Sequence, residues 1–74
     1  MSATKHLPTL RELEVLKLLS RGYSSKDISE KLYISSNTVE YHRKQLLRKT
    51  ASRNVAHLVY NAFMTGLLNV NDPD

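Results

Sequence analysis

Four helix-start signals divide this chain and leave little room for any other kind of secondary structure. In each signal, a side chain that can accept a hydrogen bond from the backbone stands just before an apolar pattern with helical spacing. The four capping residues are Thr9, Ser24, Ser35 and Asn54. We therefore expect an all-α fold, a compact bundle of four helices. The expected helices span residues of about 10–21, 25–32, 36–49 and 55–65.

The apolar positions predict which side of each helix is buried. The first helix presents Val15, Leu16, Leu18 and Leu19 to the core, and the second presents Ile28 and Leu32. The inner face expected for the fourth helix consists of Ala56, Val59, Ala62 and Phe63. Gly22 and Gly66 follow the first and fourth helices, where a left-handed residue is favoured.

The third helix has a thin apolar ridge and a broad polar face. Leu46 and Thr50 each fall within about 20° of Val39 on a helical wheel. The opposite arc, which spans roughly 100° by the same geometry, holds Asn37, Glu40, Tyr41, Lys44 and Arg48. Every member of this arc can make hydrogen bonds, as reading base pairs in a DNA major groove requires. An ordinary solvated helix face explains the arc about equally well.

The charge of the chain is uneven. The net charge of all 74 residues is +4. The segment 35–53 alone has five basic residues against the single acidic Glu40, which is also a net +4. This concentration of positive charge on and just after one helix is typical of a surface that binds a polyanion.

Length and composition exclude several classes of protein. The chain predicts one small domain over residues 9–68, with a flexible lead-in at 1–8 and an acidic tail at 69–74. There are no cysteines, hence no disulfide and no thiolate metal site. The three histidines lie in separate elements, so we expect no metal and no cofactor. No apolar run approaches membrane-spanning length and the N-terminus lacks a secretion signal, which predicts a cytoplasmic protein with no membrane partner.

Two short helices joined by a turn of about three or four residues, the second of them basic, form a helix-turn-helix pattern. Several motifs with continuous spacing extend the pattern over most of the chain. They include Thr9 with Arg11-Glu12, Gly22, Ser24-Ser25-Lys26-Asp27-Ile28, Ile34-Ser35, Thr38-Val39, His42, Lys49, Ala56, Val59, Ala62 and Gly66-Leu67-Leu68. On these residues the chain resembles the LuxR-type DNA-binding domain, also called FixJ/NarL-type or GerE-like.

The resemblance implies a transcriptional regulator, or the output domain of a response regulator, that binds double-stranded DNA with helix 36–49 in the major groove. The base-reading positions that it implies are Glu40, Tyr41 and Lys44. Glu40 can accept a hydrogen bond from a cytosine amino group, and Lys44 suits guanine O6/N7. His42 is expected to pack half-buried rather than to read bases.

The remaining contacts are expected to be with phosphates and with a second copy of the chain. The expected phosphate contacts are Ser24, Lys26, Ser35, Asn37, Thr38, Arg43, Arg48, Lys49 and Arg53. The resemblance implies a homodimer, formed in solution or only on DNA, through helix 55–65. The dimer residues are Val59, Tyr60, Phe63 and Met64, although Phe63 equally suits the core. RNA polymerase is a further candidate partner.

The chain departs from the family pattern after the third helix. Thr50, Ala51 and Ser52 replace a usual Leu-Gly-Val, so two apolar anchors and a permissive glycine are lost. This departure leaves the packing of the turn and the orientation of Arg53 open.

Three other interpretations remain. The first two helices also resemble region four of a sigma factor, although Tyr41-His42-Arg43 and the fourth helix argue against it. A helical protein-interaction module would use the apolar pair Tyr60 and Met64. An enzyme is the weakest option, because no nucleophile has an evident base and no phosphate-binding glycine loop is present.

Overall fold

The computed structural model describes residues 7–69, and these residues form four α-helices. Helix α1 spans Leu10–Ser20, α2 spans Ser25–Leu32, α3 spans Ser36–Lys49 and α4 spans Val55–Thr65. The expected all-α fold is confirmed, and every expected helix boundary agrees to within one residue. The turn between α2 and α3 has three residues, as a helix-turn-helix requires. Most of the predicted lead-in and tail lies outside the described residues.

Each helix begins at the capping residue that the sequence predicts. The Thr9 hydroxyl accepts the Glu12 N–H at 3.1 Å, and the Glu12 carboxylate accepts the Thr9 N–H at 2.9 Å. Ser24 and Asp27 form the same reciprocal pair at the start of α2. Ser35 and Asn54 cap α3 and α4 through one hydrogen bond each. These bonds satisfy backbone donors that a helix N-terminus otherwise leaves unpaired.

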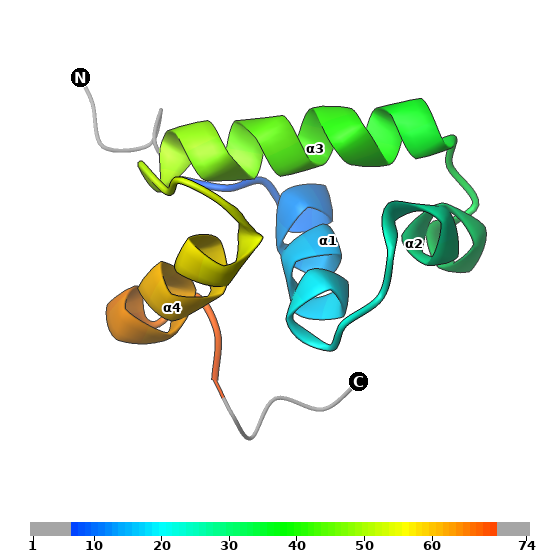
Figure 1. The fold of residues 1–74 in the computed structure, drawn as a ribbon. Coiled ribbons are helices and arrows are strands. Elements are labelled where there is room, and N and C mark those ends of the chain that lie inside the picture. Colours follow the sequence, from blue (N-terminus) through cyan, green and yellow to red (C-terminus); the bar gives the residue numbers. More distant parts are fainter. Residues whose placement is uncertain (1–6, 70–74) are drawn as a thin grey trace.

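Helix α1 lies at the centre of the domain and contacts each of the other three helices. In Figure 1, α3 runs across one side of α1, and α2 and α4 lie on either side of it. Among residues 7–69, no other helix covers the side of α3 that faces away from α1 (Figure 1). The longest helix therefore rests on the bundle by one side only.

The core is small and comes from all four helices. Its buried apolar residues are Val15, Leu16, Leu19, Ile28, Val39, Leu46, Leu58, Ala62 and Leu68. Helix α3 contributes only two of these, Val39 and Leu46, which confirms its narrow ridge. Each fully buried aliphatic side chain stabilises the fold by about 1.5–3 kcal/mol, so α3 is held by few contacts relative to its length.

The predicted inner face of α4 was wrong in part. Ala62 is buried and Val59 half-buried as expected, but Ala56 is exposed and Phe63 is 41% exposed. The residue missed is Leu58, which is fully buried. Val55, Leu58, Val59 and Ala62 follow the i, i+3, i+4, i+7 spacing of an amphipathic helix. This pattern turns Phe63 out of the core, because Phe63 lies about 100° beyond Ala62 on the helix.

Each of the four helices is followed within two residues by a left-handed residue, and two of the four are glycines. Gly22 after α1, Tyr33 after α2, Ala51 after α3 and Gly66 after α4 have φ of 90°, 59°, 53° and 85°. In the first three turns a later N–H bonds a carbonyl five residues back, for example Ser52 N–H to Leu47 O at 2.9 Å. Ala51, at a position where the family pattern has a glycine, therefore adopts a left-handed conformation despite its Cβ.

This left-handed conformation predicts that Ala51→Gly stabilises the domain. Ala51 is exposed, so its methyl group loses little packing, and relief of a left-handed L-residue is worth about 1 kcal/mol. Urea unfolding of the variant should show a higher midpoint than that of the parent. The matched control is Ala56→Gly, an exposed alanine within α4, which should lower the free energy of unfolding by about 0.5 kcal/mol. Destabilisation by both changes would contradict the argument.

Candidate nucleic-acid interface

The exposed side of α3 carries every residue that the sequence places on its polar arc. Asn37, Glu40, Tyr41, Lys44 and Arg48 are all exposed, whereas Val39 and Leu46 on the opposite side are fully buried. The helix therefore presents donors and acceptors along its outer side, on a surface that no other helix covers (Figure 1). A DNA major groove is wide enough to admit an α-helix that is exposed in this way.

Glu40, one of the three expected base readers, takes part in a cluster that joins α2 to α3. Its Oε2 accepts a hydrogen bond from the Ser25 hydroxyl at 2.5 Å. Arg43 Nη1 lies 2.9 Å from Ser25 Oγ and 3.3 Å from Glu40 Oε2. This role of Ser25 could not be predicted from a local sequence pattern, because its partners lie 15 and 18 residues away.

The other two expected base readers carry fewer interactions. Lys44 is exposed, and Tyr41 is 58% exposed with its ring in edge-on contact with the His42 ring, 5.8 Å between centroids. His42 itself is half-buried, which agrees with its expected packing role. Its Nδ1 is fully buried with no hydrogen-bond partner among the described residues.

The expected phosphate contacts form two groups and several separate residues. Ser24 and Lys26 lie at the exposed start of α2, and Ser35, Asn37 and Thr38 lie at the start of α3. Positive partial charge at a helix N-terminus favours a bound anion. Arg43 lies in the Ser25 cluster, Arg48 is exposed and donates to Gln45 Oε1, and Arg53 is exposed before α4.

Lys49 differs from the other expected phosphate contacts because it is held in an ion pair. Its Nζ donates to Glu12 Oε1 at 2.8 Å, and the side chains of Lys49 and Glu12 are only 14% and 4% exposed. The same carboxylate oxygen also accepts the Thr9 N–H at the start of α1. Lys49 thus ties the end of α3 to the start of α1, and this role does not favour a contact with phosphate.

The Glu12 carboxyl is stabilised as an anion despite its burial. Burial by itself would raise its pKa. The hydrogen bonds from Lys49 and the Thr9 N–H, together with the electrostatic influence of Lys49 and the nearby His42, lower that pKa below its ordinary value. Glu12 is therefore charged at neutral pH, and the pair is an ionic link through the interior.

The outward side of α4 carries three large apolar residues. Tyr60, Phe63 and Met64 are 60%, 41% and 67% exposed. Val59, the fourth expected dimer residue, is half-buried and packs against the core. The first three form the exposed part of the expected dimer surface.

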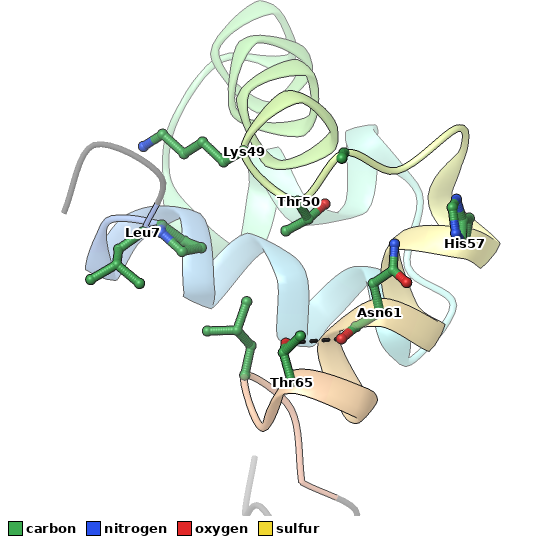
Figure 2. A pocket seen from close by; sticks show the side chains of 9 residues that line it. Leu7, Lys49, Thr50, His57, Asn61 and Thr65 are labelled. Atoms are coloured by element: carbon green, nitrogen blue, oxygen red, sulfur yellow. Dashed lines mark hydrogen bonds between the residues drawn. The ribbon is translucent and has the colours of Figure 1, made fainter. Parts of the chain in front are cut away.

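A pocket of about 580 Å³ opens at the C-terminal end of α3, between that end, α4 and Leu7-Pro8. Figure 2 shows Thr50, His57, Asn61 and Thr65 along its wall, with the Lys49 amino group directed away from His57 and Asn61. His57 Nδ1 accepts the Arg53 N–H, and Asn61 donates to Ser52 Oγ. These bonds hold the turn whose packing the sequence left open.

Comparison with known proteins settles the family. The model of the family described as "Bacterial regulatory proteins, luxR family" matches residues 8–62, which is most of the chain. The chain belongs to the luxR family. It is therefore a helix-turn-helix DNA-binding domain of transcription regulation, and α2 and α3 are its helix-turn-helix. This family consists of non-enzymatic regulators, in agreement with the weak case for an enzyme.

Individual relatives support the same assignment. Over 59 residues the chain is 42% identical to the oxygen regulatory protein NreC of Staphylococcus haemolyticus, and over 58 residues it is 43% identical to that of Staphylococcus epidermidis. These matches cover 80% and 78% of this chain but 27% of each relative. The chain thus spans about a quarter of the length of the curated relatives that it matches. Among residues 7–69, no helix has the length and apolar character of a membrane span.

The Glu12–Lys49 pair predicts a large cost for Lys49→Met. The substitution keeps most of the apolar stem but leaves Glu12 charged and unpaired in the interior, which costs about 3 kcal/mol. Urea unfolding at pH 7 measures this loss. Lys44→Met is the matched control, because Lys44 is an exposed lysine on the same helix and should change stability by less than about 0.5 kcal/mol. Equal effects of the two changes would show that the ion pair does not stabilise the fold.

The lowered pKa of Glu12 also predicts a pH dependence. The free energy that it contributes is present above the pKa of the unfolded chain, about 4.3. It is lost as pH falls through the lower folded-state pKa. Between pH 7 and pH 2.5, the free energy of unfolding should therefore fall more steeply for the parent than for Glu12→Gln. This variant keeps a capping acceptor without the charge. Identical slopes would contradict an ionised Glu12.

Proposed function

We propose that this domain binds a specific double-stranded DNA sequence as a dimer, with α3 in the major groove and α4 at the dimer contact. The observation that carries the proposal is the outer side of α3, where exposed hydrogen-bonding residues lie on a surface free of other helices. The basic excess over residues 35–53 supplies the attraction to phosphate that such a complex needs.

In this arrangement Glu40, Tyr41 and Lys44 read base edges, and the surrounding residues position the helix on the backbone. The proposed backbone contacts are Ser24, Lys26, Ser35, Asn37, Thr38, Arg43, Arg48 and Arg53. Lys49 is left out, because its amine is bonded to Glu12. Arg43 keeps further N–H donors beyond its bonds to Ser25 and Glu40, so it remains able to reach a phosphate.

The dimer contact that we propose uses Tyr60, Phe63 and Met64, with Val59 at its inner margin. A large exposed apolar cluster on one helix is typical of an interaction surface. Because the curated relatives are about four times as long as the match, we further propose that the domain acts as the output part of a longer cytoplasmic response regulator. RNA polymerase is the candidate partner for activation.

Selection from a pool of random duplexes tests the function directly. The chain should enrich one motif, and two-fold-related half-sites about one helical turn apart would support the dimer. Lys44→Ala should weaken binding to the enriched motif by about 1–3 kcal/mol, roughly 5- to 150-fold in Kd, with a smaller effect on random DNA.

The control is Lys31→Ala, which removes the same charge from an exposed lysine of α2 that lies over the Tyr23 ring. It should not change the preference between motif and random duplexes. If the two variants weaken both kinds of duplex equally, Lys44 reads no base. If the parent chain retains no DNA even at low salt, the proposed function is wrong.

A further inference from the structure

Ser25 lies in the first turn of α2, yet its side chain bonds two residues of α3. A serine hydroxyl has one proton to donate. In this structure the hydroxyl donates to Glu40 Oε2 at 2.5 Å and accepts from Arg43 Nη1 at 2.9 Å. Ser25 therefore donates its only hydroxyl proton to Glu40, and its oxygen accepts a hydrogen bond from the Arg43 guanidinium.

The three side chains form a closed triangle around one carboxylate oxygen. Arg43 Nη1 also donates to Glu40 Oε2, at 3.3 Å. Each of the three bonds has at least one charged partner, which makes it stronger than a neutral hydrogen bond. The two bonds of Ser25 cross between α2 and α3. The Glu40 side chain is thus already ordered in the free protein. Binding to DNA therefore costs little further side-chain entropy at this residue.

Ser25 and Arg43 both donate to Oε2 of Glu40, and among residues 7–69 no group donates to its Oε1. The side chain is still 55% exposed and lies on the outer arc of α3. A carboxylate can only accept hydrogen bonds. The major groove offers two amino groups as donors, N4 of cytosine and N6 of adenine, but adenine N6 lies beside the N7 acceptor, which repels a carboxylate. Cytosine N4 is therefore the better match, whereas the O6 and N7 acceptors of guanine and the phosphates repel Glu40.

We propose that Ser25, with Arg43, is a positioning residue that holds Glu40 Oε1 ready to accept a hydrogen bond from the N4 amino group of a cytosine. This inference rests on the proposed function, and it adds the base that one position of the half-site must contain. Ser25 acts only through Glu40 and touches no base itself.

The test compares the motifs that the intact chain and three variants enrich from one pool of random duplexes. The parent motif should contain one position at which cytosine is strongly preferred. Glu40→Gln should reduce that preference about tenfold, and Ser25→Ala about fivefold, with the other positions unchanged. Ser25→Thr keeps the hydroxyl and should retain the parent preference.

Two further measurements separate positioning from stability. Thermal unfolding shows whether Ser25→Ala folds like the parent, and the double variant Ser25→Ala/Glu40→Gln should lose no more cytosine preference than Glu40→Gln alone, since Ser25 acts through Glu40. A parent motif without a required cytosine, or a Ser25→Ala variant that binds all sequences equally less well, would overturn the inference. A parent chain that enriches no motif would overturn the proposed function and this inference with it.

Discussion

The position of the C-terminal end of α3 depends on a single buried ion pair. Glu12 completes the capping box of α1 and, through the same carboxylate oxygen, accepts the Lys49 amine from a position 37 residues further on. The start of the central helix α1 and the end of α3 are therefore fixed to each other. The apolar ridge of α3 is too thin to provide this alone, because only Val39 and Leu46 are buried in it. An ionic link through the interior defines position more sharply than apolar contact, which has no preferred direction.

Only a narrow side of α3 packs against the rest of the domain. Most of its surface therefore remains available to a ligand. The buried pair at its C-terminal end and the Ser25 cluster near its N-terminal end attach it to two different helices, α1 and α2. Between these attachments the outer arc is exposed, and it is rich in donors and acceptors. In this small domain, one helix therefore serves both the core and the proposed interface.

Local signals predicted the helices, and long-range contacts escaped them. The four capping residues gave the helix boundaries because capping acts over three residues. The inner face of α4 was mispredicted although the correct spacing, with Leu58, was available in the sequence. The roles of Glu12 with Lys49, and of Ser25 with Glu40, could not be predicted, since no spacing rule connects side chains so far apart in the chain. The exposed positions of the polar-arc residues were predicted. The ion pair with Glu12, which gives Lys49 a structural role, was not.

The central claim is that the outer side of α3 is the surface that meets DNA. Titration of the isotopically labelled chain with an enriched duplex, followed residue by residue by NMR, tests it most directly. We expect the largest chemical-shift changes on residues 35–48 and on Ser24–Lys26, with smaller changes at Tyr60 and Met64 from dimer formation. Changes concentrated on the pocket at His57 and Asn61, with α3 unaffected, would contradict it.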